Sequence, residues 1–217
     1  MNYEILTVTP FAQNCTLLIC PETKDAAIFD PGGDVESILA VIRKKGVNVT
    51  QILLTHGHID HVGGVVELNE YLHVPVIGPH RDDAPLIEAL AQQASMFGFP
   101  MVKTFTPDRW LEEGDSINVG TRRLEVYHCP GHAPGHVIFF DRAARLAQVG
   151  DVLFNGGIGR TDLPGGDHAS LLRSIRDKLW PLGDDVTFIP GHGAISTFCE
   201  ERRSNPFVSD SILGPGR

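Results

Sequence analysis

The sequence predicts a single α/β domain of two similar halves, packed sheet to sheet with helices on the outer faces. Short apolar runs alternate with amphipathic helical stretches in both halves of the chain. The 217 residues are 42% hydrophobic and 21% charged, which suffices for a buried core without disulfides. No linker or low-complexity tract interrupts the chain, so one domain is expected over residues 1–217.

The first half of the chain predicts strands and helices in alternation. A helix is expected over residues 34–46, where an apolar stripe runs from Val35 to Ile42. Asp34 suits the N-cap of this helix, and Gly46 suits its C-terminal stop. The other elements expected here are strands at 15–20, 26–30, 51–55 and 74–78, and helical stretches at 62–72 and 82–99.

The second half repeats this alternation. Residues 167–180 predict a helix that turns Leu171, Leu172 and Ile175 inward. The mixture of strands and helices in both halves favours helices that cover the outer faces of the sheets. The remaining elements expected are strands at 122–129, 136–141, 145–150 and 185–190, and a short closing helix at 196–203.

Charge and composition exclude several classes of partner. The net charge of −9 argues against nucleic acid, because phosphate backbones are bound by basic patches. No run approaches the roughly 18 apolar residues of a membrane span, so no membrane partner is expected. The first ten residues do not resemble a signal peptide, and the four cysteines form no C-x-x-C pair. We therefore expect reduced thiols and a cytoplasmic location. No pattern predicts an oligomeric state.

Histidines and aspartates gather directly after four of the predicted strands. The segment THGHIDHVGG, residues 55–64, follows one strand and places four metal-capable side chains within six positions. Each of three later strands leads into one further candidate. Catalytic groups gather at such places, because strands are rigid and the following loops can shape a site. The candidates are His56, His58, Asp60, His61, His132, Asp151 and His192.

This donor set is typical of a catalytic metal site. Imidazole suits zinc, iron and nickel, and a carboxylate can bridge two ions. A structural zinc site would more often use cysteines, and no suitably spaced cysteines are present. For His136 we expect a supporting role beside the ligands. The histidines interpreted as ordinary surface or hydrogen-bonded residues are His73, His80, His128 and His168.

Several segments resemble a known superfamily. THGHIDH resembles the H-x-H-x-D-H motif of the metallo-β-lactamase superfamily, and His132, Asp151 and His192 fall where its later ligands fall. The resemblance covers essentially the whole chain and implies an αββα sandwich with the site at one edge. More narrowly, HCPGHAPGHVIFF, GDVLFNGGIGRTDLPGGDH and PGHG followed by ERRSNPF resemble the short bacterial form of glyoxalase II, the hydroxyacylglutathione hydrolases.

The superfamily resemblance implies a site with two divalent metal ions. Zinc is the expected metal, and iron or manganese also suit these ligands. A hydroxide bridging the ions would be the nucleophile, so Asp60 and Asp151 are the expected catalytic residues. The narrower resemblance implies hydrolysis of S-(2-hydroxyacyl)glutathione, such as S-D-lactoylglutathione, to glutathione and a 2-hydroxy acid in methylglyoxal detoxification. The implied ligands are His56, His58 and His132 for the first ion and Asp60, His61 and His192 for the second, with Asp151 bridging both.

The chain departs from the longer glyoxalase II enzymes where they hold glutathione. Only 25 residues follow His192, so we expect their helical C-terminal domain to be missing, and Ala194 stands where they carry a tyrosine. Arg160 is the candidate for binding a glutathione carboxylate, with a surface salt bridge as the alternative. Residues 95–99, SMFGF, are expected to pack in the core, with an acyl pocket or lid as the alternative.

Two rival activities share parts of the resemblance. The persulfide dioxygenase branch of the superfamily uses one iron held by two histidines and an aspartate, with glutathione persulfide as substrate. It resembles this chain around GRTD, residues 159–162. Against it, PGHG at 190–193 keeps a full second site. A lactonase or another ester hydrolase of the same fold is the other alternative.

Overall fold

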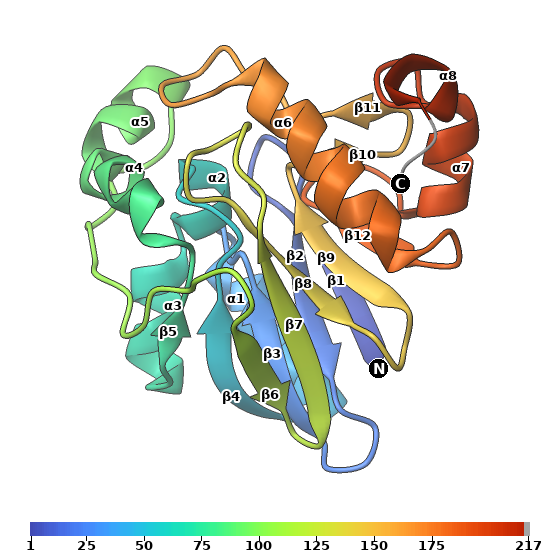
Figure 1. Ribbon diagram of the computed structural model, residues 1–217. Helices are drawn as coiled ribbons and strands as arrows, with labels where there is room; N and C mark the ends of the chain where they lie inside the picture. Colours follow the sequence, from blue (N-terminus) through green and yellow to red (C-terminus); the bar gives the residue numbers. More distant parts are fainter. Residues whose placement is uncertain (215–217) are drawn as a thin grey trace.

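Two β-sheets packed face to face form the centre of the protein, and helices cover both outer faces (Figure 1). The structure is a computed structural model that describes residues 1–214. This αββα sandwich confirms the fold class expected from the sequence. The expected end of the domain, at residue 217, lies outside the described residues.

The first sheet has five strands in the order β1-β2-β3-β4-β5. Antiparallel pairing joins β1 to β2 and β2 to β3, and parallel pairing joins β3 to β4 and β4 to β5. Because β3 and β4 are parallel, their C-terminal ends meet at one edge of the sheet. The strands are β1 (Asn2–Val8), β2 (Gln13–Ile19), β3 (Asp25–Phe29), β4 (Asn48–Leu53) and β5 (Val76–Ile77).

The second sheet has six strands in the order β13-β12-β9-β8-β7-β6. β12 is parallel to β9, and β8 is antiparallel to both β7 and β9, so β7, β9 and β12 end at the same edge. The strands are β6 (Ser116–Val119), β7 (Arg122–His128), β8 (Val137–Asp141), β9 (Leu146–Gly150), β12 (Thr187–Pro190) and β13 (Ser196–Thr197), and a separate ribbon pairs β10 (Leu153–Phe154) with β11 (Gly157–Ile158).

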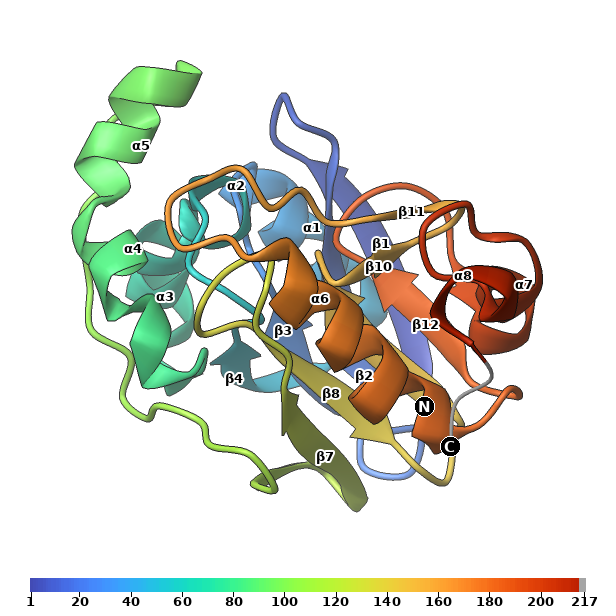
Figure 2. The same cartoon turned by 45° about the horizontal axis from the view of Figure 1, so that its top comes forward.

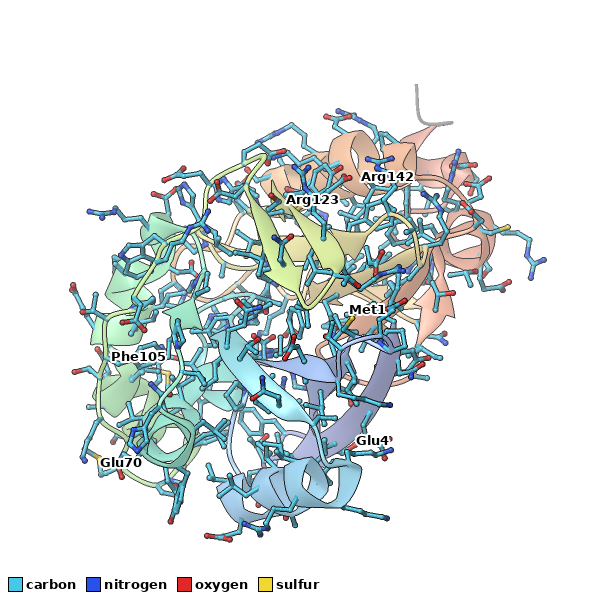
Figure 3. The ribbon with its side chains drawn as sticks, turned by 90° about the horizontal axis from the view of Figure 1, so that it is seen from below. Met1, Glu4, Glu70, Phe105, Arg123 and Arg142 are labelled. Carbon is cyan, nitrogen blue, oxygen red and sulfur yellow. The ribbon has the colours of Figure 1, made fainter. Side chains whose placement is uncertain are left out.

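Helices cover the first sheet on one side and the second sheet on the other, as the view from below shows (Figure 3). In the view with the top forward, α4 and α5 lie on one side of the molecule and α7 and α8 on the other (Figure 2). None of the helices in residues 1–214 has the length and apolarity of a membrane span. The helices are α1 (Val35–Lys45), α2 (Ile59–Val62), α3 (Val65–Leu72), α4 (Ala84–Glu88), α5 (Leu90–Phe97), α6 (His168–Ser174), α7 (Phe198–Ser204) and α8 (Asp210–Leu213).

A layer of apolar side chains from both sheets fills the space between them. Phe29 of β3 and Phe139 of β8 meet edge to face, with ring centroids 5.1 Å apart. Both rings are almost completely buried. Removing such a ring typically lowers the free energy of unfolding by about 3–5 kcal/mol, so this layer contributes strongly to holding the two sheets together.

The structure differs from the sequence-based expectations at a few elements. Asp34 precedes α1 as expected, but its carboxylate accepts a hydrogen bond from the Thr9 N–H at 2.7 Å and makes no cap bond. The helix expected over 82–99 divides into α4 and α5, because Ala89 leaves the helical conformation. The helix expected over 167–180 is α-helical only to Ser174 and continues in π and 3-10 turns. The strands β1 and β6 were not expected.

Candidate metal centre

Four strands deliver the candidate ligands to one edge of the sandwich. The loop after β4 carries His56 and His58, and it leads into α2, whose first turn contains Asp60 and His61. β7, β9 and β12 end at the same edge of the second sheet. The loops that follow these three strands carry the other candidates, His132, Asp151 and His192.

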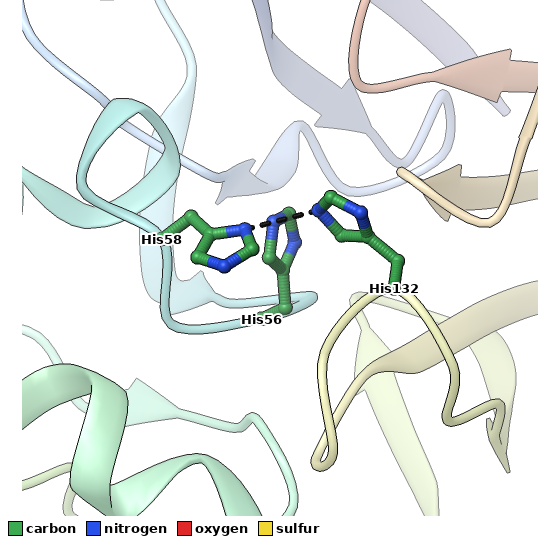
Figure 4. Close-up of side chains that lie close together, drawn as sticks. All are labelled: His56, His58 and His132. Atoms are coloured by element: carbon green, nitrogen blue, oxygen red, sulfur yellow. Dashed lines mark hydrogen bonds between the residues drawn. The ribbon is translucent and has the colours of Figure 1, made fainter. Parts of the chain in front are cut away.

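Three histidines form a first cluster (Figure 4). His56 and His58 come from the loop after β4, and His132 comes from the loop after β7. His58 Nδ1 lies 3.0 Å from His132 Nε2, and the His56 ring centroid lies 4.8–4.9 Å from the other two. All three side chains are buried. One potential ligand atom from each lies within 4.8 Å of the others, close enough to hold one cation.

Asp60, His61 and His192 form a second cluster beside the first. His192 Nε2 lies 3.2 Å from Asp60 Oδ2, and His61 Nε2 lies 3.7 Å from the same oxygen. His61 is completely buried, whereas His192 is partly exposed toward the pocket. The second cluster therefore combines imidazole with carboxylate and is the more accessible of the two.

Asp151 lies between the two clusters. Its Oδ2 is 3.5 Å from His132 Nε2 in the first cluster and 3.6 Å from His192 Nε2 in the second. Its Oδ1 is 3.3 Å from His61 Nε2. The structure thus places the Asp151 carboxylate where it faces ligand atoms of both clusters.

The electrostatic character of the two clusters differs. Burial and the neighbouring imidazoles lower the pKa of His56 well below its ordinary value, and burial and His132 lower that of His58 to about 3. Burial would also lower the pKa of His61, but Asp151 and Asp60 overcome this and raise it well above its ordinary value. The first cluster is therefore neutral with free lone pairs, and the second is built around ionised carboxylates.

Several buried polar atoms of the centre have no hydrogen-bond partner among residues 1–214. They are His56 Nε2, His61 Nε2 and Asp151 Oδ1. Burying such atoms without a partner is unfavourable, and cations bound at the two clusters would satisfy them. A Cβ atom on Gly191 would lie 2.1 Å from Asp151 Oδ1, so glycine keeps this space open. Nitrogen and carboxylate donors in this arrangement fit divalent metal ions.

Hydrogen bonds on the far side of the rings orient the candidate ligands. His61 Nδ1 lies 3.0 Å from Asp30 Oδ2, and His192 Nδ1 lies 3.1 Å from the Phe11 carbonyl oxygen. His132 Nδ1 lies 2.8 Å from the carbonyl oxygen of Arg160. Such contacts fix which nitrogen faces a metal ion and are part of the site.

Asp30 is a site residue that the sequence interpretation missed. It follows β3, and its carboxylate accepts hydrogen bonds from the Thr55 N–H at 2.8 Å and the Thr55 hydroxyl at 2.6 Å as well as contacting His61. The signal was present in AAIFD, which ends in a carboxylate at the end of a buried strand, like the strands that led to the other candidates.

Asp83 is a second residue that the sequence did not reveal. Its buried carboxylate accepts hydrogen bonds from the Gly57 N–H at 2.8 Å and the Gly135 N–H at 2.5 Å. Gly57 lies between His56 and His58, and Gly135 lies in the loop that carries His132. Asp83 therefore ties together the two loops that supply the first cluster.

His136 has the supporting position expected of it. The ring is buried and stacks on His56 with centroids 4.7 Å apart. Its Nε2 accepts a hydrogen bond from the Asp151 N–H at 3.0 Å. His80 and His128 lie outside the centre, stacked on each other and hydrogen-bonded to Glu112 and the Pro134 carbonyl oxygen.

A pocket of about 360 Å³ opens onto both clusters. Arg160 lines it, but the guanidinium donates to both carboxylate oxygens of Asp162 at 2.7 Å and is more than half exposed. The expectation that SMFGF packs in the core is confirmed in part, since Phe97 and Phe99 pack against the core and Phe97 also lines the pocket. It is wrong at Met96, which is 64% exposed. Phe97 contacts Phe11 across the rim, with centroids 5.9 Å apart, because α5 projects beyond the sheet that it covers.

Comparisons with known proteins identify the family and the fold. The family model for the metallo-beta-lactamase superfamily matches residues 8–192. Hydroxyacylglutathione hydrolase GloC of Haemophilus influenzae is 47% identical over 210 residues, covering 96% of this chain and 99% of the relative. The solved structure of BLEG-1 B3 metallo-beta-lactamase has a TM-score of 0.89 at 35% identity, covering 95% and 99% of the two chains. TTHA1623 in a di-iron-bound form has a TM-score of 0.87 at 39% identity, covering 94% and 100%.

Proposed function

The chain belongs to the metallo-β-lactamase superfamily and is a metal-dependent hydrolase, and we propose that its substrates are glutathione thioesters. The proposed reaction cleaves S-(2-hydroxyacyl)glutathione, such as S-D-lactoylglutathione, to glutathione and a 2-hydroxy acid in methylglyoxal detoxification. The observation that carries the proposal is Asp151 between two complete ligand clusters. The 47% identity to a hydroxyacylglutathione hydrolase supports the choice of substrate.

The proposed metal centre uses the residues described above. Two divalent ions bound there would lower the pKa of a shared water molecule and polarise the substrate carbonyl. Zinc is the proposed metal, with iron and manganese as alternatives, and a di-iron form is known for a 39% identical structure. The first ion would be held by His56, His58 and His132 and the second by Asp60, His61 and His192, with Asp151 shared.

The chain's own groups would orient the substrate and exclude water from one side of it. Asp30 and the Phe11 carbonyl oxygen hold His61 and His192 with Nε2 toward Asp60 and Asp151. Phe11, Phe97 and Phe154 line the pocket and would shield the reacting bond from bulk water. Asp60 faces the pocket through Oδ2, the oxygen nearest His192, and is the second proposed catalytic residue.

Arg160 is the proposed contact for a carboxylate of glutathione. It lines the pocket, and its guanidinium already binds one carboxylate, that of Asp162, through two parallel bonds. A glutathione carboxylate would replace Asp162 in this geometry.

The proposed domain extends over residues 1–217, and the proposed location is the cytoplasm, which is supported by the four free cysteines.

A β-lactam is the second candidate substrate, because a solved structure 35% identical to this chain is a B3 metallo-beta-lactamase.

A persulfide dioxygenase, the rival oxidoreductase, would use a single iron. The complete second cluster of Asp60, His61 and His192 supports a binuclear hydrolase instead. A lactonase would use the same centre on a different ester.

The test is anaerobic hydrolysis of S-D-lactoylglutathione by purified protein whose metal content is measured in the same sample. We expect rapid thioester loss without oxygen, abolished by a chelator and restored by added metal. No turnover with both metal sites filled would overturn the proposed function. A cephalosporin, a lactone, and glutathione persulfide with oxygen uptake recorded would then identify the activity.

A further inference from the structure

A second pocket adjoins the reaction pocket on the side of the first cluster. It has a volume of about 360 Å³ and shares with the reaction pocket a wall made of His58, Gln93, Phe97 and Leu163. A lactoyl group has only three carbon atoms and would sit at the metal centre. The second pocket is large enough for a further part of a substrate, since ligand sites typically measure roughly 300–1,000 Å³.

The walls of the second pocket are mainly apolar. The side chains that belong to it alone include Pro85, Leu86, Ala89 and Met96, and most of the exposed lining is carbon. Among residues 1–214, no lysine or arginine lines it, and Asp82 is its one carboxylate. A glutathione carboxylate would therefore be repelled there, and its cationic partner Arg160 lines only the reaction pocket.

The shared wall can be passed by an apolar chain without breaking hydrogen bonds. Besides the candidate ligand His58, this wall has one polar residue, Gln93, whose amide is already satisfied by the main chain. Its Oε1 accepts from the Ile59 N–H at 3.0 Å, and its Nε2 donates to the Leu86 carbonyl oxygen at 2.8 Å. Covering Gln93 with a hydrocarbon therefore leaves no buried polar group without a partner.

We infer that the second pocket binds the apolar substituent of the acyl group, so that the enzyme prefers thioesters with acyl chains longer than lactoyl. The inference rests on the proposed function and names its substrate class. The scissile carbonyl lies at the metal centre, the acyl chain continues past His58 into the second pocket, and the glutathionyl part stays in the reaction pocket with Arg160. No covalent step beyond thioester hydrolysis is involved.

The first test compares S-lactoylglutathione with S-(2-hydroxyhexanoyl)glutathione, which differs only by three methylene groups. Burying each methylene is worth about 0.8 kcal/mol, so kcat/KM can rise by up to roughly fiftyfold, and we expect at least about tenfold. The thioesters of lactate with propanethiol and with hexanethiol differ by the same three methylene groups, placed on the leaving group. Their kcat/KM values should differ little, because the second pocket lies on the acyl side.

The second test fills the second pocket with a larger side chain at one of its lining residues. Ala89→Phe places a ring in the second pocket without touching the reaction pocket, and Ala91→Phe is the matched control on the exposed side of α5. We expect Ala89→Phe to reduce the ratio of the two kcat/KM values, hydroxyhexanoyl over lactoyl, to near one. Ala91→Phe should keep the wild-type ratio.

A binding measurement separates affinity from turnover. S-hexylglutathione and S-methylglutathione cannot be hydrolysed, and the hexyl form should bind the metal-loaded protein at least about tenfold more tightly, a difference that Ala89→Phe removes. Cleavage of lactoylglutathione with no gain from the longer acyl chain, or an equal gain from hexanethiol over propanethiol as the leaving group, overturns the inference alone. Cleavage of no thioester by the metal-loaded protein overturns the proposed function as well.

Discussion

The candidate metal ligands and the side chains at the rim of the reaction pocket differ in burial and in how firmly they are held. We call the first group the ligand shell and the second the pocket wall. In the ligand shell, His61 and His132 are each held from behind by a hydrogen bond, and both rings are almost fully buried. In the wall, Arg160 is more than half exposed and is paired with Asp162, two residues away. Phe11 and Met96 project into solvent beside the pocket.

The difference separates chemistry from substrate choice. A ligand shell tied to both sheets cannot shift without disturbing the core, so it fixes the reaction that the site can perform. Exposed side chains on loops and at the end of α5 can be substituted without disturbing the core, so they determine which substrate is bound. Substitutions in the shell should therefore act on kcat and metal content, and substitutions in the wall should act on KM.

The largest effect is expected at Asp151. Asp151→Ala should reduce kcat/KM for the thioester by roughly a thousandfold or more, because it removes a carboxylate that faces both clusters. The measurement is steady-state kinetics together with metal content per chain. Undiminished catalysis with both metals bound would show that Asp151 does not bridge them.

Asp83 should affect stability through the two loops that it joins. Asp83→Ala leaves the Gly57 and Gly135 N–H groups buried without an acceptor, so the free energy of unfolding should fall by about 2–4 kcal/mol. Denaturant unfolding of the metal-free protein measures this directly. Asp82→Ala is the control, since the neighbouring Asp82 side chain is exposed and should change stability little. Equal effects at both positions would contradict the role of Asp83.

Asp30 should act on metal affinity without touching the metal itself. Asp30→Asn weakens the contact that orients His61, and such changes typically lower metal affinity by roughly 10- to 100-fold. Competition with a chelator of known affinity measures the change. A loss of folding without a change in affinity would mean that Asp30 serves only the Thr55 loop.

Much of the ligand shell could be predicted from sequence because its signal is local. His56, His58 and His61 crowd into one short segment after a strand that is buried and apolar, and β8 and β9 were found because all their residues are buried. β1 was missed because most of its side chains are at least partly exposed, so it has no apolar run.

The pocket wall could not be predicted because no single segment contains it. Gln93 and Leu163 lie far apart in the chain. They line the same two pockets because α5 and the loop before α6 both approach the candidate metal ligands. Asp83 gives no sequence signal either, since its role depends on two backbone N–H groups from distant loops. Sequence patterns indicate burial and local spacing. The roles of Gln93, Leu163 and Asp83 depend instead on contacts between distant segments.

Arg160 should show the contrasting behaviour of the wall. Arg160→Ala should raise KM for glutathione thioesters by roughly threefold to fivefold and change kcat little, since an exposed ion pair is a modest contribution. Initial rates over a range of substrate concentrations measure both constants. An unchanged KM would remove Arg160 from the substrate site.

The smallest effect is expected at Asp162. The guanidinium of Arg160 lowers the pKa of this carboxyl to about 2, so it is ionised at neutral pH and competes with a substrate carboxylate for Arg160. Asp162→Asn should therefore lower KM by about twofold. The same substitution in an Arg160→Ala background should have no effect, and a persistent effect there would contradict the competition.

The most direct test of the account is anomalous scattering from crystals of the metal-loaded protein. We expect two ions per chain, one beside His56, His58 and His132 and one beside Asp60, His61 and His192, with Asp151 in contact with both. A single ion, with His192 turned away and Asp151 bound on one side only, would contradict the binuclear centre.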